Sequence, residues 1–231
     1  MIESAARIGA VSMPLPGAVI FDNDGLLLDT ERAWTRAEER LFERHGATFT
    51  IEHKRYILGS AAEVAAAKLE ELLALPGCGQ ALRDELQEIV MEEVLRGAPP
   101  MPGAVELVAE LRGRGVPVGL ASNSLREFVD RALAVSGMAD SFEATLAGDE
   151  VARPKPAPDL YLGVAARLGV APQECVALED SQTGVAAARA AGMFVIGVPN
   201  LAGVELPEAD LVAGSLRDPT VRAALRLRAA A

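Results

Sequence analysis

The sequence contains little cysteine and no excess of basic residues, and these shortages exclude several classes of protein. Its 231 residues include two cysteines, Cys78 and Cys175, which lie far apart and form no metal-ligand or redox spacing. A reducing compartment is the simple interpretation. The 22 basic and 33 acidic residues give a net charge of −11, and no basic cluster indicates a nucleic-acid partner. This charge repels anionic substrates, so a phosphate-binding site must supply its own positive charge.

Long hydrophobic runs are also missing, although 50% of the residues are hydrophobic. No apolar run is long enough to span a membrane. The N-terminus has Glu3 and Arg7 before a short apolar stretch that Pro14 and Pro16 interrupt, which makes a poor signal peptide. We therefore expect a soluble cytoplasmic protein, a monomer or weak homodimer, with no membrane partner and no nucleic-acid partner.

The most informative segment is residues 19–25, where an apolar run ends in Asp22, Asn23, Asp24 and Gly25. The run predicts a buried strand. Residues two apart in extended backbone point to the same side, so we expect Asp22 and Asp24 to face one small volume and Asn23 to point away. Two like charges held so close need a cation or a proton between them. The segment therefore predicts a metal-binding site that carries out chemistry.

The rest of the chain follows two patterns. Residues 31–96 have a helical pattern rich in Ala, Leu and Glu, which the segment Pro99-Pro100-Met101-Pro102-Gly103 breaks. Beyond it strands and helices alternate, which implies right-handed crossovers and a mostly parallel sheet. The predicted strands are 17–22, 116–121, 175–178 and 194–198, and the predicted helices beyond the break are 105–112, 124–135, 158–168 and 183–191.

These patterns predict an α/β fold with two domains. A doubly wound core comprises residues 1–30 and 99–231, and an all-helical cap is inserted at residues 31–98. In such sheets the site lies beyond the carboxyl ends of the strands. Residues 124–127, Ser-Leu-Arg-Glu, match a capping box, which predicts that Ser124 begins a helix.

Further polar residues follow the predicted strands of the core. Ser122 and Asn123 follow one strand, Glu179 and Asp180 follow another, and Lys155 lies between two prolines. Taken singly, each has an ordinary structural explanation as turn chemistry, a solvated loop charge or a helix cap. Their joint occurrence at strand ends, in this order, favours one site built from several loops.

With these residues the chain resembles the haloacid dehalogenase (HAD) superfamily over nearly its whole length. The first motif of that family matches residues 22–30, Asp-x-Asp-Gly-x-x-x-Asp-Thr, and the other motifs match Ser122-Asn123, Lys155 and Glu179-Asp180. The helical insertion lies where the branch with beta-phosphoglucomutase-like proteins and many small-molecule phosphatases carries its cap. The four motifs together are highly specific.

The resemblance implies a reaction through an aspartyl-phosphate and a requirement for Mg²⁺. Asp22 would be the nucleophile, which as a carboxylate needs no base to activate it. Mg²⁺ prefers oxygen ligands and would offset the repulsion between carboxylate and phosphate. The family pattern assigns the side chains of Asp22 and Asp180 and the backbone carbonyl of Asp24 as ligands, with Glu179 binding directly or through water.

The resemblance also implies roles for the remaining motif residues. The Asp24 side chain would protonate the leaving group and then take a proton from the attacking water. Ser122 and the Asn123 backbone would bind the phosphoryl oxygens, and Lys155 would stabilise the charge of the transition state. Gly25 would let the backbone approach the ligand. Dehalogenase members lack the second acid, so its presence indicates phosphate esters.

Candidate substrate-binding residues in the helical insertion carry weaker signals. Trp34 occupies the position where beta-phosphoglucomutase-like mutases have a histidine, and its helical phase equally fits packing of the first cap helix. Lys54 and Arg55 form a basic cluster with His53 before Leu58-Gly59-Ser60, which suits either a second anionic group of the substrate or a solvated helix face. The mutases have an arginine after the glycine, where this chain has Ser60.

The sequence thus favours a Mg²⁺-dependent phosphatase of a small phosphorylated metabolite, with a sugar phosphate as the leading candidate. A phosphosugar mutase is the nearest alternative, and the missing histidine counts against it. A signalling receiver domain also surrounds a phospho-aspartate with acidic residues, but its acidic pair comes from another strand and it has no helical cap. A metabolite-binding protein that has lost activity is the third alternative.

Overall fold

The computed structural model describes residues 16–57, 60, 62–200 and 203–227. The N-terminal residues interpreted above as a poor signal peptide precede this part, apart from Pro16, and Leu58 and Gly59 also fall outside it. Within it no helix combines the length and the apolar character that crossing a membrane requires.

The core of the protein is a parallel sheet in the strand order β3-β2-β1-β4-β5-β6. The central strand β1 (Ala18–Phe21) is fully buried and pairs on one side with β2 (Val118–Ala121) and on the other with β4 (Cys175–Glu179). The outer strands are β3 (Ala144–Leu146), β5 (Phe194–Gly197) and β6 (Leu211–Val212).

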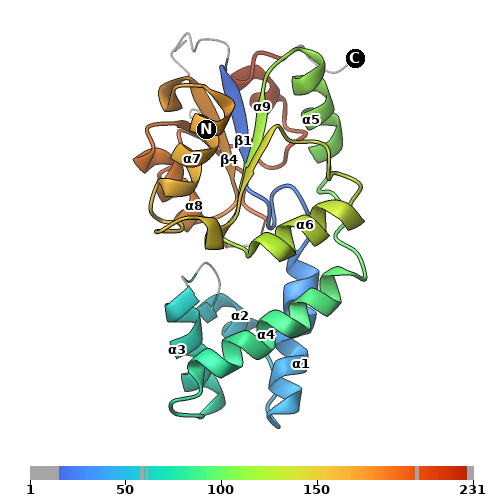
Figure 1. The fold of residues 1–231 in the computed structure, drawn as a ribbon, viewed down its shortest axis with the longest axis vertical. Coiled ribbons are helices and arrows are strands. Elements are labelled where there is room, and N and C mark those ends of the chain that lie inside the picture. The colour runs from blue at the N-terminus through green and yellow to red at the C-terminus, as the bar shows by residue number, and fades with distance from the viewer. Residues whose placement is uncertain (1–15, 58–59, 61, 201–202, 228–231) are drawn as a thin grey trace, which may run out of the picture.

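Helices cover both faces of this sheet. Successive side chains of a strand point to opposite faces, and in the buried strands both sets are apolar. Ala18 and Ile20 of β1 face α7 (Asp159–Leu168) and α8 (Gln182–Ala190), whereas Val19 and Phe21 face the opposite layer. That layer comprises the helices α5 (Ala104–Gly113), α6 (Arg126–Val135) and α9 (Pro219–Ala224). Figure 1 shows α7 and α8 on one side of the sheet and α5 on the other. The predicted doubly wound α/β class is therefore confirmed.

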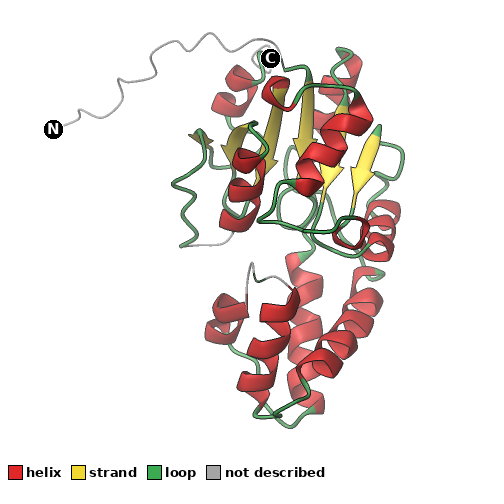
Figure 2. Cartoon of the chain, turned by 60° about the vertical axis from the view of Figure 1, so that its left-hand side comes forward, coloured by secondary structure: helices red, strands yellow, loops and turns green. Residues whose placement is uncertain are grey.

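The helical insertion stands below the carboxyl ends of the central strands (Figure 2). It contains α1 (Glu31–Arg44), α2 (Ile51–Ile57), α3 (Ala62–Leu73) and α4 (Gly79–Val94). Helices α1 and α4 lie side by side because the apolar face of α1, with Leu41 and Phe42, is buried against α4. The two loop segments that connect the core to the cap lie side by side. The amide of Asp29 donates to Pro99 O and that of Met101 to Leu27 O, both at 2.8 Å. The division at residues 30 and 99 stays a prediction.

Candidate active site

The site begins where β1 ends, at Asp22. The Asp22 amide donates to the Leu178 carbonyl at 3.0 Å, which continues the pairing with β4 for one more residue. The residue is buried, and burial is the main reason why its pKa rises to about 8. Lys155 opposes this rise, whereas the neighbouring Glu179 and Asp24 carboxylates add to it. The site therefore holds more negative charge than its own residues neutralise.

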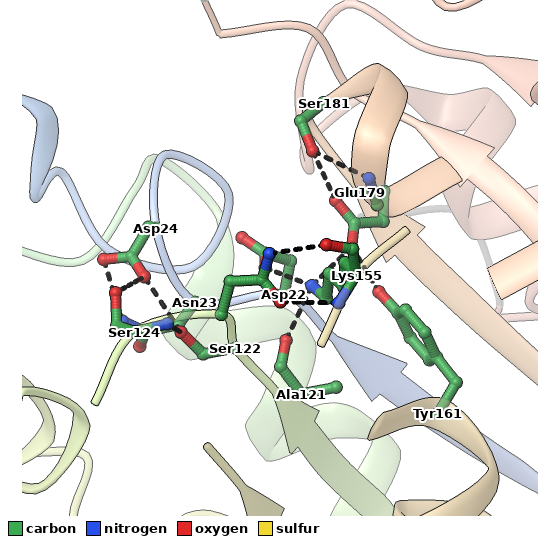
Figure 3. A network of polar contacts seen from close by, with 12 residues as sticks. Asp22, Asn23, Asp24, Ala121, Ser122, Ser124, Lys155, Tyr161, Glu179 and Ser181 are labelled. Carbon is green, nitrogen blue, oxygen red and sulfur yellow. Dashed lines mark hydrogen bonds and ion pairs between the residues drawn. The ribbon is translucent and has the colours of Figure 1, made fainter. Parts of the chain in front are cut away.

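Lys155 lies at the centre of the site and contacts three strand ends. Its Nζ donates to Asp22 Oδ1 at 2.5 Å, to Glu179 Oε1 at 2.6 Å and to the carbonyl of Ala121 at 2.8 Å (Figure 3). Burial disfavours the charged lysine, but the two carboxylates outweigh it and raise the Lys155 pKa above its ordinary value. Lys155 is therefore a fixed positive charge beside the Asp22 carboxylate.

Asn123 positions the segment that carries Lys155. The backbone amide of Lys155 donates to Asn123 Oδ1 at 2.8 Å, and Asn123 Nδ2 donates to the Lys155 carbonyl at 3.1 Å. Sequence reasoning expected the Asn123 backbone to bind phosphate, and the paired hydrogen bonds of its side chain are an additional feature. They link the end of β2 to the lysine loop.

Glu179 is fully buried and engaged on both carboxylate oxygens. Tyr161 OH donates to Oε1 at 2.5 Å, beside the lysine, and Ser181 Oγ donates to Oε2 at 3.3 Å. Gly184 of α8 packs directly on this carboxylate, and a Cβ at that position would clash with it. Tyr161 was not singled out from the sequence, because a tyrosine on the buried face of a helix has no feature that distinguishes it from a core residue.

Asp22, Glu179 and Asp180 form a group of carboxylates that could hold a cation. One oxygen from each lies within 4.8 Å of the others. The pKa of Asp180 is raised well above its ordinary value, first by burial and then by the charges of Asp22 and Glu179. Three carboxylates face the single ammonium of Lys155, and a divalent cation with a preference for oxygen ligands would relieve this imbalance. The donor set therefore fits Mg²⁺.

The Asp24 carboxylate lies apart from that group, in a cluster of hydroxyl groups. Its oxygens accept hydrogen bonds from Thr30 Oγ1 at 2.8 Å, Ser122 Oγ at 3.0 Å and Ser124 Oγ at 2.8 Å. Figure 3 shows it beside the two serines, while Asp22 lies beside Lys155. Both carboxylates line one cavity, as expected, but they have different hydrogen-bond partners, because β1 ends at Phe21 and strand alternation no longer applies beyond it.

Two sequence interpretations are corrected in this region. Asn23 is fully buried and its Nδ2 donates to Asp24 Oδ1 at 3.2 Å, so it does not point away from its acidic neighbour. Ser124 does not begin a capping box, because α6 starts at Arg126 and the Ser124 hydroxyl is directed to Asp24. Two serines two residues apart after a strand could have indicated that both hydroxyls reach the site. The match to a capping box favoured the start of a helix instead.

Gly25 brings the first loop close to the second acidic strand end. Its φ of +83° lies in the left-handed region that glycine adopts without strain. A Cβ at this position would overlap an oxygen of Asp180 and approach Asn200 Nδ2 at 3.2 Å. Gly25 therefore permits the close packing of the β1 loop against Asp180.

A cavity of about 530 Å³ separates the core site from the helical insertion. Its core side includes Asp22, Asp24, Asn123, Lys155 and Asp180, and its cap side is formed by residues from all four cap helices. This volume is within the range of cavities that enclose small ligands. The cap therefore covers the carboxylates with a space of the size of a small metabolite.

Trp34 and Arg55 line this cavity, as expected for candidate substrate-binding residues. The Trp34 ring also packs at 5.6 Å between centroids on Phe128 of α6, so it contacts the core as well as the cavity. Arg55 is exposed on α2. The structure thus brings both residues to the cavity, and contact with a substrate stays a prediction for each.

Lys54 does not form a free basic cluster with its neighbours. Its side chain is buried, and Nζ pairs with Glu38 at 2.9 Å and with Glu31 at 3.0 Å, both on α1. His53 stacks on Phe42 at 5.2 Å between centroids. Lys54 therefore joins two cap helices, and the interpretation of this stretch as a solvated face is wrong at these two residues.

Comparison with known proteins defines the class of this protein. The sequence pattern of the hydrolase family described as haloacid dehalogenase-like hydrolase matches residues 16–192. The chain belongs to this family, and the predicted family membership is confirmed. It is an enzyme, a hydrolase that resembles named phosphatases over most of its length.

The chain is also similar to individual named proteins. The chain is 38% identical over 207 residues to a Drosophila melanogaster protein named "Probable pseudouridine-5'-phosphatase", which covers 86% of this chain and 89% of that protein. It is 34% identical over 190 residues to hexitol phosphatase B of Escherichia coli K12, with 79% and 83% covered. Among solved structures, CbbY from Rhodobacter sphaeroides in complex with phosphate matches with a TM-score of 0.75 and 26% identity, covering 87% of this chain and 95% of that one.

Proposed function

We propose that this protein is a Mg²⁺-dependent phosphatase that hydrolyses a small phosphorylated metabolite through an aspartyl-phosphate on Asp22. The observation that supports this most is the position of Asp22, buried between the Lys155 ammonium and the carboxylate of Asp180 and open to the cavity beneath the cap. A nucleophilic carboxylate, a fixed cation and a cation-binding group are the parts that transfer of a phosphoryl group requires.

Asp22, Asp180 and the backbone carbonyl of Asp24 would hold the metal, with Glu179 contributing directly or through water. Bound Mg²⁺ would offset the repulsion between the Asp22 carboxylate and the substrate phosphate. Lys155 keeps its proton in this surrounding and would balance the charge that spreads over the phosphoryl oxygens. An oxygen of Asp22 attacks phosphorus, and the bond from phosphorus to the ester oxygen breaks.

Asp24 would serve the proton transfers. It gives a proton to the departing ester oxygen and then takes one from the water that attacks phosphorus, which restores the Asp22 carboxylate and releases inorganic phosphate. Ser122 now donates to Asp24, so binding of substrate would redirect this hydroxyl towards a phosphoryl oxygen. Ser124 and Thr30 would continue to hold the Asp24 carboxylate in place.

The size of the cavity and the relatives favour a compact phosphomonoester such as a sugar phosphate. The two relatives above are named for activity on a nucleoside phosphate and on a hexitol phosphate. Both compounds are phosphate esters of small polyhydroxylated molecules. A phosphosugar mutase is the second candidate, because structures with 26–28% identity include a beta-phosphoglucomutase-type protein of Thermotoga maritima. Trp34 in place of the mutase histidine supports the phosphatase.

The test is phosphate release from hexose phosphates, hexitol phosphates and nucleoside monophosphates, with Mg²⁺ and with EDTA, beside the variant Asp22→Asn. We expect metal-dependent release that falls at least ~10³-fold in the variant, since the loss of a covalent nucleophile removes the main route. Interconversion of hexose 1- and 6-phosphates without free phosphate would indicate the mutase. A folded wild-type protein that releases no phosphate from any ester would refute the proposal.

A further inference from the structure

We propose that Arg83 and Gln87 of α4 form a second recognition site, which binds acceptor oxygens on the part of the substrate that carries no scissile phosphate. This inference rests on the proposed function, because it names the leaving-group chemistry that the same cavity selects. It assigns to α4 a role in specificity that is separate from the motif residues of the core.

Arg83 and Gln87 are one helical turn apart and both line the cavity. Residues four apart on a helix lie on the same face, with Leu86 of α4 beside them in the wall. Gln80, one turn before Arg83, lies outside the cavity lining, is exposed and bonds to Asp84 at 2.7 Å. The part of α4 that faces the ligand space therefore presents one arginine and one amide beside Leu86.

Both cavity residues have buried donors without a partner. Arg83 Nε and Gln87 Nε2 are shielded from solvent, and neither has a hydrogen-bond partner within the described parts of the chain. A buried donor without an acceptor is unfavourable, and such groups in native proteins usually have a reason. Lys54 on the same wall differs, because Glu38 and Glu31 already neutralise it.

The chemistry of these groups defines what they would bind. A guanidinium has only donors, and the free atom of Gln87 is also a donor, so the ligand must supply acceptor oxygens. Hydroxyl, carboxylate and ring-carbonyl oxygens meet this requirement, whereas an alkyl chain does not. Trp34 in the same cavity offers an apolar ring for the C–H surface of such a molecule.

One ligand can reach both sites because they line one continuous space. The cavity of about 530 Å³ includes Asp22 and Lys155 on the core side and Arg83 and Gln87 on the cap side. A phosphate held at Lys155 would leave the remainder of the substrate pointing to α4. The substrate class is therefore a phosphomonoester whose leaving group is rich in oxygen atoms.

The experiment compares Arg83→Met and Gln87→Met with the wild-type enzyme on matched esters. Methionine has a long side chain and a high helix propensity, but it lacks the N–H donors. Hexitol 6-phosphate, 6-phosphogluconate and uridine 5'-phosphate test hydroxyl, carboxylate and ring-carbonyl acceptors, and n-hexyl phosphate has the length of a hexitol without hydroxyls. Matched controls are Gln80→Met, an exposed residue of α4 outside the cavity lining, and Arg112→Met, an exposed residue of α5.

We expect each cavity variant to lower kcat/KM on its preferred oxygen-rich ester by ~10-fold or more, chiefly through KM, and to change n-hexyl phosphate by less than ~2-fold. The two controls should match the wild type on all esters. If Arg83→Met fails to fold, Arg83→Lys serves instead, because it keeps the charge but lacks the Nε donor.

Three outcomes would overturn the inference: unchanged kinetics of both variants on the oxygen-rich esters, an equal loss on n-hexyl phosphate, or a wild-type preference for n-hexyl phosphate. In each of these the enzyme still hydrolyses esters, so the proposed function stands. Absence of phosphate release from every ester would instead contradict the proposed function itself.

Discussion

Asp24 and Asp22 have different surroundings although they lie only two residues apart in the chain. Three hydroxyl groups donate to the Asp24 carboxylate, whereas Asp22 meets an ammonium and two carboxylates. Asp24 has a polar setting of hydroxyl groups that suits the exchange of a proton with a ligand. Asp22 has a buried, charged setting that suits binding to a cation and attack on phosphorus.

The substitution Asp24→Asn tests the proton-transfer role at this scale. The amide keeps the size and accepts hydrogen bonds on one side, but it cannot exchange a proton. We expect kcat to fall by ~10²–10⁴-fold on a phosphomonoester, with a much smaller change in KM, measured by steady-state phosphate release. The control is Asp29→Asn, a carboxylate of the same loop that pairs with Arg32. Wild-type turnover in Asp24→Asn would exclude the acid–base role.

At the residue scale the sequence predicted well those groups that follow a strand. Asp22 and Glu179 meet in the structure because the carboxyl ends of β1 and β4 share one edge, and Lys155 reaches both from the loop before α7. Tyr161 and Ser124 were not predicted. Each lies in or before a helix, where its type and spacing fit a core or capping position, and only the tertiary fold directs its hydroxyl to a carboxylate.

At the scale of elements, a buried charge cluster joins α1 and α2 of the cap. Lys54 of α2 lies between Glu31 and Glu38 of α1. Burial raises the Glu38 pKa to about 7, although the Lys54 charge works against it. The Lys54 pKa is raised as well, because these two carboxylates outweigh the effect of burial. Glu38 therefore gains a proton in the folded cap at a higher pH than in the unfolded chain.

This shift predicts a pH dependence of cap stability. Between about pH 4.5 and 7 the folded state binds a proton that the unfolded state has lost, so the contribution of Glu38 is full below this range and falls as pH rises through it. The slope from one group is at most about 1.4 kcal/mol per pH unit. Glu38→Gln cannot ionise, so its Tm relative to the wild type should rise from pH 5 to pH 8.

Thermal unfolding at several pH values measures this effect, and Glu43→Gln on the exposed side of α1 is the control. The control should follow the wild-type pH dependence. An identical pH slope of Tm in wild type and Glu38→Gln would contradict the assignment of this proton to Glu38.

Element prediction succeeded where segments are long and regular. The strands that became β1, β2, β4 and β5 and the helices α5, α7 and α8 were expected within a few residues of their bounds. The edge strands β3 and β6 were not expected, because they have three and two residues and too short a pattern to recognise. Their place in the sheet depends on pairing with β2 and β5, which a local pattern does not contain.

At the scale of the whole molecule, a strongly acidic protein concentrates its chemistry at one edge of a sheet. The net charge of −11 repels phosphate esters, and the buried site opposes this with Lys155 and a group of carboxylates suited to a cation. The cap lies over the cavity at that edge and adds Arg83 to its wall. The core motifs could be predicted from the sequence, whereas Arg83 and Gln87 could not, because their place at the cavity depends on how α1–α4 pack over the site.

The central claim is that Asp22 carries the phosphoryl group during turnover. The most direct measurement is a rapid acid quench of the Mg²⁺-loaded enzyme with its best ester substrate, followed by mass spectrometry of the peptide that contains Asp22. We predict that this peptide gains one phosphoryl group during turnover, that the group disappears when substrate is exhausted, and that Asp22→Asn shows neither the modification nor phosphate release. Release at the wild-type rate by Asp22→Asn, with no modified peptide in either protein, would contradict the account.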